Sequence, residues 1–146
     1  MAPHDRTDPV ILGHILAQHR ELHEQITSAR TAFSSGPAAA ARRALETLRG
    51  HLAAHFHQEE RGGFLEESIT RMPRLSPAAA GVLREHPALL AEVDDLIERL
   101  AVPDIPESSW ARAGRDFERF CTHLLAHERN ENAVVQAGYN EDLGLE

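Results

Sequence analysis

Cysteine is nearly absent from this sequence, and its scarcity excludes two kinds of structure. Among 146 residues Cys121 is the single cysteine, so no disulfide can form within the chain and no cluster of thiolates can hold zinc. We expect this lone thiol to be a small buried residue rather than a reactive group. Any metal that the chain binds should therefore be held by nitrogen and oxygen ligands.

Long apolar runs are missing as well. No uninterrupted apolar stretch approaches the roughly 18 residues of a membrane-spanning helix, and the first residues lack the charged and then apolar pattern of a secretion signal. Lysine is absent too, so all fifteen basic residues are arginines, and twenty-three acidic residues give a net charge of -8. A negative chain is poorly suited to nucleic acid or to an anionic membrane surface. These absences predict a cytoplasmic protein without a nucleic-acid or membrane partner.

Helical periodicity fills most of the chain. Apolar residues recur at steps of three and four over residues 9–34, 37–61, 77–101 and 107–137, without any useful period-two alternation. The connection at 64–75 has room for a short helix, Gly138 is expected to end the last helix, and residues 139–146 form an acidic tail. The sequence therefore predicts one all-α domain over residues 1–146, an antiparallel up-down-up-down four-helix bundle.

Polar side chains occupy several positions where this periodicity calls for leucine. Polar groups in a bundle core cost several kcal/mol each when they lack a partner, so something must compensate them. A bound metal ion would do so directly. The inward positions hold four histidines and two glutamates: His19, His55, Glu59, His86, His127 and Glu131.

Two of the helices carry the same motif. His55 stands four residues before Glu59, and 72 positions later His127 stands four residues before Glu131; residues four apart share one face of a helix. A lone histidine on an apolar face is usually a hydrogen-bonded core residue, and one His/Glu pair is usually a surface contact. That explanation, which leads to a metal-free interaction domain, would have to hold on four helices at once. The repetition favours a metal site instead.

The two halves of the sequence suggest how these groups would share two cations. By their pseudo-symmetry, His19 and His55 would hold one metal, and His86 and His127 would hold the other. The glutamates of the two motifs would then bridge the pair. A chain rich in histidine and glutamate but poor in cysteine favours iron, manganese or zinc as the metal.

The order His, His-x-x-x-Glu, His, His-x-x-x-Glu resembles the hemerythrin family of HHE cation-binding proteins, in its bacterial and mycobacterial hemerythrin-like branch. The resemblance implies a four-helix bundle that holds a non-haem di-iron centre with carboxylate and oxygen bridges. Such a centre reacts with dioxygen, peroxide or nitric oxide. The resemblance covers nearly the whole chain and rests on four phrases: Gln18-His19-Arg-Glu-Leu22, His55-Phe-His-Gln-Glu59-Glu60, Glu85-His86-Pro-Ala-Leu89 and His127-Glu128-Arg-Asn-Glu131.

The sequence departs from the oxygen-carrying members of that family at two positions. Those proteins have a second histidine four residues after the first on the third helix, where this chain has Leu90. Their last motif contains an Asp, where this chain has Glu131. A missing imidazole leaves a coordination position open, which favours activation of peroxide over reversible binding of dioxygen.

Other polar residues beside the motifs have expected roles. Glu60 and Glu128 should orient imidazoles or pair with arginines, and His57 should face solvent. Three more histidines are candidates for additional ligands because each lies one turn from an assigned one: His23, His51 and His123.

The leading functional hypothesis is catalase-like disproportionation of hydrogen peroxide at two iron ions. The alternative is a non-catalytic protein that binds dioxygen, nitric oxide or iron for storage or sensing. The expected partners are thus small ligands such as dioxygen, hydrogen peroxide or nitric oxide. Exposed Phe33, Phe56 or Trp110 would allow weak self-association, so monomer and weak homo-oligomer both stay open.

Overall fold

The computed structural model describes residues 4–142, and the side chains of residues 13–139. Four long helices and one short helix account for most of these residues, and residues 4–142 contain no strand. The elements in order are α1 (His4–Ser35), α2 (Ala38–Glu60), α3 (Phe64–Arg71), the 3-10 turn η1 (Pro73–Leu75), α4 (Ser76–Arg99) and α5 (Glu107–Asp142).

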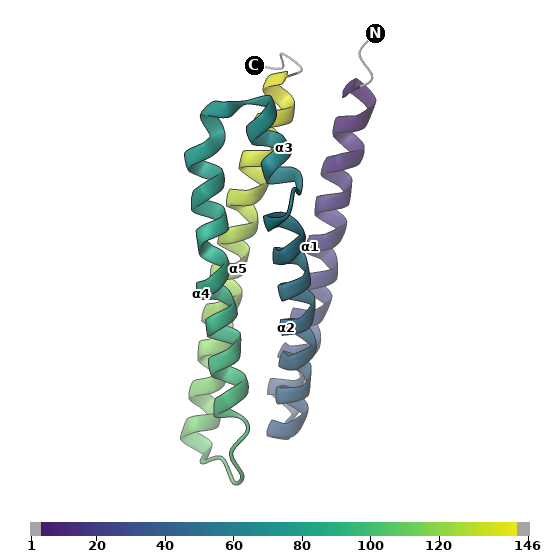
Figure 1. Cartoon of the computed structure of the whole chain (residues 1–146). Helices are drawn as coiled ribbons and strands as arrows, with labels where there is room; N and C mark the ends of the chain where they lie inside the picture. Colours follow the sequence, from purple (N-terminus) through teal and green to yellow (C-terminus); the bar gives the residue numbers. More distant parts are fainter. Residues whose placement is uncertain (1–3, 143–146) are drawn as a thin grey trace.

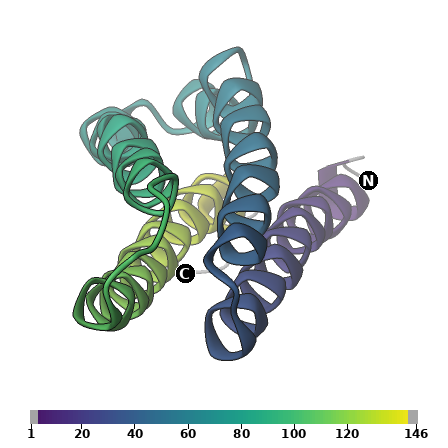
Figure 2. The same ribbon diagram turned by 90° about the horizontal axis from the view of Figure 1, so that it is seen from below.

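The four long helices run antiparallel to their sequence neighbours (Figure 1). Seen along its length, the bundle places α1 beside α2 and α4 beside α5 (Figure 2), and α2 also contacts α4 while α1 contacts α5. The all-α, up-down-up-down prediction is thereby confirmed. In the part of the chain that the structure describes, no helix is long and apolar enough to cross a membrane.

Local sequence signals set the helix boundaries. Gly36 adopts φ +60, a conformation that favours glycine, and its N–H donates to Ala32 O at 2.8 Å, which closes the last turn of α1. Pro77 lies in the first turn of α4, where a missing N–H does no harm. The connection at 64–75, which has room for a short helix, does contain one, α3.

A layer of polar groups divides the buried core in two. The lower cluster lies between the four long helices and includes Leu45, Leu96 and Phe117. The upper cluster includes Ile15 of α1 and Leu65 of α3, together with residues of α4 and α5. Because α2 ends at Glu60, just past this layer, α3 supplies the upper apolar contacts in its place.

The last helix does not end at Gly138. It continues to Asp142, and Tyr139, expected as the first residue of an acidic tail, is buried. Gly138 is needed for a different reason, because a Cβ there would lie 2.7 Å from Ser68 Cβ and 3.0 Å from Ser68 Cα. The glycine therefore allows α3 to lie against α5. Residues 143–146 of the expected tail lie outside the described residues.

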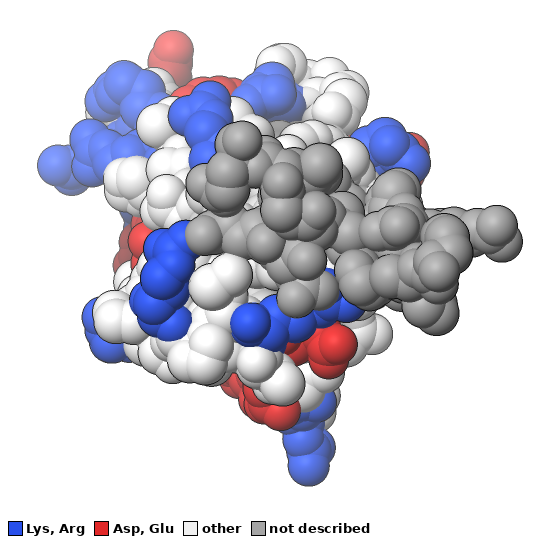
Figure 3. All heavy atoms as spheres, turned by 90° about the horizontal axis from the view of Figure 1, so that it is seen from above, with Lys and Arg blue, Asp and Glu red and all other residues white. Residues whose placement is uncertain are grey.

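Charges of both signs are mixed on the end of the bundle that carries α3. Figure 3 looks down on that end and shows arginine side chains around its margin with acidic groups between them. Along the sides, Arg30 pairs with Glu118 at 2.8 Å between α1 and α5, and Arg49 pairs with Asp94 at 2.9 Å between α2 and α4. Exposed pairs of this kind contribute at most about 1 kcal/mol each, so apolar burial carries most of the stability.

Replacing Gly138 with alanine should destabilise the protein. Alanine favours a helix, but its Cβ would force α3 and α5 apart, so we expect a loss of about 1–3 kcal/mol in the free energy of unfolding. Gly50→Ala is the matched control, because a Cβ at Gly50 meets nothing within 4 Å, and it should stabilise α2 by up to about 1 kcal/mol. Urea denaturation measures both, and equal stability of the two variants would refute this account of Gly138.

Candidate metal centre

All six of the polar residues placed inward by the sequence are buried at one level of the bundle. The i, i+4 motifs put two of them on the inner face of α2 and two on the inner face of α5, and α1 and α4 add one histidine each. Relative exposure does not exceed 9% for any of them: His19, His55, Glu59, His86, His127 and Glu131.

Four of these residues form a first group between α1, α2 and α5. Each of His19, His55, Glu59 and Glu131 offers one ligand atom within 4.8 Å of the others. His19 Nε2 lies 2.6 Å from Glu131 Oε1, and His55 Nε2 lies 2.9 Å from Glu59 Oε2. This set of two imidazoles and two carboxylates has the composition of a transition-metal site.

Glu59 also belongs to a second group, with His86 of α4 and His127 of α5. Its Oε1 lies 3.0 Å from His86 Nε2, while its Oε2 faces His55. A carboxylate with one oxygen toward each group is placed to bridge two cations. Glu131, by contrast, belongs to the first group alone, and bridging by Glu131, which the repeat suggests, stays a prediction.

Several buried ligand atoms lack hydrogen-bond partners. They include the Nε2 atoms of His55, His86 and His127 and one oxygen each of Glu59 and Glu131. Although His55 Nε2 and Glu59 Oε2 are close, they are not aligned as a hydrogen bond. Unpaired buried polar atoms are costly in a protein interior, whereas lone pairs that converge on one point suit a cation. The two groups therefore fit a metal-binding site.

Carboxylates on the outer side of the site hold two of the imidazoles in place. His86 Nδ1 lies 2.7 Å from Glu60 Oε2, and His127 Nδ1 lies 2.7 Å from Glu85 Oε1. If each Nδ1–H donates to its carboxylate, the Nε2 lone pair points into the site. The sequence predicted this role for Glu60, but it missed Glu85, which reaches His127 across the α4/α5 interface.

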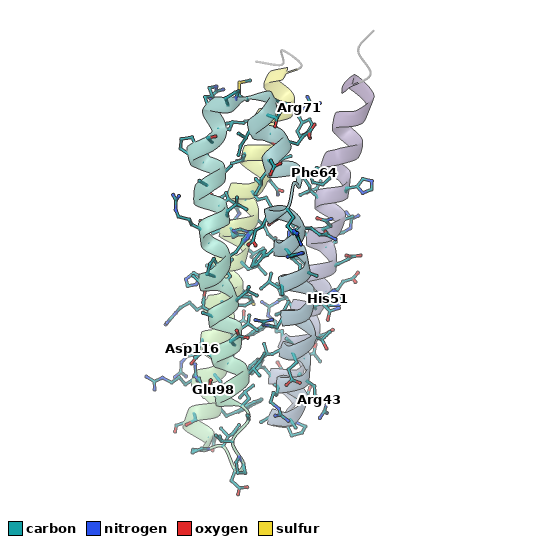
Figure 4. The ribbon with its side chains drawn as sticks, in the orientation of Figure 1. Arg43, His51, Phe64, Arg71, Glu98 and Asp116 are labelled. Carbon is teal, nitrogen blue, oxygen red and sulfur yellow. The ribbon has the colours of Figure 1, made fainter. Side chains whose placement is uncertain are left out.

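The additional histidine candidates lie outside both groups. His23 Nε2 is 2.7 Å from Oε1 of the buried Glu128. Glu128 therefore orients the His23 imidazole rather than an imidazole of the two groups. His123 is exposed and pairs with Glu92 at 2.9 Å. His51 is exposed on α2, where Figure 4 labels it.

Phe56 forms part of the site, although the sequence suggested that it would be exposed. It is 2% exposed, and its ring stacks on His86 with 3.8 Å between ring centroids and 5° between planes. Its neighbour His55 points toward the first group, so adjacent positions on α2 both face inward. The α4 side of the bundle covers this flank of α2, which periodicity along one helix cannot show.

Burial and the neighbouring imidazoles shift the pKa values of three inward groups. Burial raises the pKa of Glu59, but the close imidazoles of His55 and His86 together outweigh that effect and lower the pKa to about 2. Burial lowers the pKa of His19 and of His127. Ionised carboxylate and neutral imidazole are the forms that bind metal ions.

Comparison with known proteins agrees with this geometry. A family model described as Hemerythrin HHE cation binding domain matches residues 10–138. Neither the curated proteins nor the solved structures gave a significant match.

Without metal, the protein should lose stability as the pH falls from about 7 toward 5. Unfolded His19 and His127 take up protons near pH 6.5, whereas their lowered pKa keeps them neutral in the fold. The unfolded state then binds more protons, and each histidine removes up to about 1.4 kcal/mol per pH unit from the free energy of unfolding. Urea denaturation in chelator measures this. His127→Gln should flatten the profile and the exposed-site variant His57→Gln should not; a flat wild-type profile would contradict the prediction.

Proposed function

The chain belongs to the hemerythrin HHE cation-binding family, and on this premise we propose that it is a non-haem di-iron protein that disproportionates hydrogen peroxide. The observation that carries the proposal is the pair of buried His/Glu groups that share Glu59. The proposed ligands are the six residues of these groups: His19, His55, Glu59, His86, His127 and Glu131. Iron is proposed on the donor set, which manganese and zinc would also suit.

When bound, two iron ions would supply the two-electron change by which one peroxide is oxidised to dioxygen and a second is reduced to water. The chain's own residues prepare the site for this chemistry. Glu60 and Glu85 fix the orientation of His86 and His127. Below the site, the fully buried side chains of Leu48, Leu52, Phe120 and Leu124 exclude water.

The difference between the two groups supports peroxide chemistry over simple storage. The first group offers four protein ligands and the second offers three. A metal with fewer protein ligands keeps more positions for an exogenous ligand. On α4, Leu90 occupies the position one turn after His86 and supplies no imidazole. This proposed asymmetry leaves room for peroxide next to Glu59.

Metal content tests the ligand assignment. Wild-type protein purified without oxygen should contain two iron ions per chain by elemental analysis. Glu59→Ala removes the shared carboxylate and should abolish loading of both positions, whereas Glu131→Ala should mainly weaken the His19/His55 position. Glu24→Ala, an exposed change on α1, is the control. Full loading of Glu59→Ala would refute the proposed bridge.

Peroxide turnover tests the reaction. The iron-loaded wild type should release dioxygen from hydrogen peroxide, and Glu131→Ala should lose most of this activity because the first group loses a ligand. An oxygen electrode measures the rate, and optical spectra on adding dioxygen report reversible binding. A reversible spectrum without turnover would identify the alternative, a non-catalytic binding or sensing protein. Activity that survives Glu131→Ala would contradict the peroxide mechanism.

A further inference from the structure

A pocket opens where α2 ends and α3 takes its place in the bundle. Its volume is about 270 Å³, and it lies between α1, the turn joining α2 to α3, and α5. Four apolar side chains line its walls: Ile15, Phe64, Leu65 and Val135. Figure 4 labels Phe64 at the junction of α2 and α3. We call this hollow the α2–α3 pocket.

The inner end of the α2–α3 pocket reaches the metal centre on its carboxylate side. Glu59 and Glu131 both line it, and Glu59 Oε1 and Glu131 Oε2 are buried without a hydrogen-bond partner. The pocket therefore joins the surface to the glutamate that the two groups share and to the second glutamate of the first group.

Two other hollows approach the site, but each meets an imidazole. One of about 180 Å³ reaches His55, and one of about 370 Å³ between α4 and α5 reaches His127. On the second path His127 Nδ1 already lies 2.7 Å from Glu85 Oε1, so a ligand there would meet an imidazole edge whose nitrogen has a partner. Of the three hollows, the α2–α3 pocket alone is lined by both carboxylates.

Two glutamines lie at the mouth of the α2–α3 pocket. Gln18 Nε2 on α1 donates to Gln58 Oε1 on α2 across 3.4 Å, and both side chains are at the surface. A bond of this length between exposed amides contributes well under about 1 kcal/mol. Side-chain rotation can therefore widen the mouth at little cost. Behind it, Gly63 holds the turn close to α2, because a Cβ there would lie 3.0 Å from Gln58 O.

We propose that the α2–α3 pocket is the route by which small uncharged ligands reach the carboxylate side of the metal centre. This inference rests on the proposed di-iron function for its purpose. An anion would lose hydration against the four apolar walls and would meet two carboxylates at the inner end. An uncharged molecule has neither disadvantage. Because a water molecule occupies about 30 Å³ in the liquid, the pocket has room for a peroxide, nitric oxide or dioxygen.

Thiol labelling of the full chain tests access without depending on metal. Val135 lines the pocket and is 1% exposed, whereas Val134 is 5% exposed and does not line it. With neutral methyl methanethiosulfonate, Val135→Cys should react at least about tenfold faster than Val134→Cys. If the labelling rate followed the relative exposure of the two side chains, Val134→Cys would react faster than Val135→Cys. Cys121 adds little background, because burial raises its pKa to about 11.

The labelling also tests charge selection. The anionic sulfonatoethyl methanethiosulfonate should react with Val135→Cys several-fold more slowly than the neutral reagent, after correction for the rates of both reagents with a free thiol. Equal rates for Val135→Cys and Val134→Cys would overturn the route. Equal corrected rates for the two reagents would overturn its selectivity for uncharged ligands.

Closing the mouth tests the route in the iron-loaded protein. Gln18→Trp should slow nitric oxide binding, measured by stopped-flow absorbance, by about tenfold. Ala54→Trp is the control, because Ala54 lines the hollow that leads to His55 but not the α2–α3 pocket, and it should bind nitric oxide at the wild-type rate.

Iron analysis of each variant separates the two hypotheses. If the chain holds no iron but the thiol at position 135 is labelled as expected, the proposed function fails and the pocket stands as an access route. If iron is bound and Gln18→Trp takes up nitric oxide at the wild-type rate, the access route fails and the metal centre stands. Because Gln18 also lines the hollow beside His55, slow rates in both Gln18→Trp and Ala54→Trp would overturn the α2–α3 route in favour of that hollow.

Discussion

The convergence of buried imidazoles and carboxylates from four helices constrains this structure more than any other feature. Several of their inward atoms, such as His127 Nε2 and Glu131 Oε2, have no hydrogen-bond partner, and each would be costly in an apolar interior. Convergence on a cation compensates them only if all four helices keep their rotation and their register. Apolar burial brings the helices together, but it tolerates small shifts far better than a ligand set does. The polar layer therefore selects one arrangement from among several packed ones.

This layer also explains why the bundle changes composition along its length. Below it the core is enclosed by the four long helices, and above it α3 stands in for α2. Ending α2 at Glu60 leaves Glu59 in the last turn, beside the turn that leads to α3. The close approach of Gly138 to Ser68 then fixes α3 against α5. The α2–α3 pocket beside Phe64 lies where α3 takes the place of α2. The break between these two helices therefore both closes the upper core and opens the pocket that leads to the site.

Periodicity along single helices predicted the four long helices and the six inward polar residues, because a 3.6-residue repeat determines which face is buried. It could not predict features that depend on how two helices meet. Phe56 is buried because His86 of α4 and His127 of α5 pack against it, and Glu85 orients His127 across the α4/α5 interface. Gly138 was expected to end the last helix, but its role is to let α3 approach α5 closely at Ser68. The internal repeat suggested equal glutamates, whereas relative helix positions leave Glu59 in both groups and Glu131 in one.

That inequality bears on how the proposed centre would work. Two metals with identical ligand sets would compete equally for an incoming ligand, but here the second group has three protein ligands and the first has four. Glu59 is both the residue common to the two groups and part of the inner wall of the α2–α3 pocket. A molecule that follows this pocket therefore arrives at the carboxylate between the two positions rather than behind an imidazole. The end of α2 thus places Glu59 both between the two groups and at the inner end of the pocket through which a small ligand would approach.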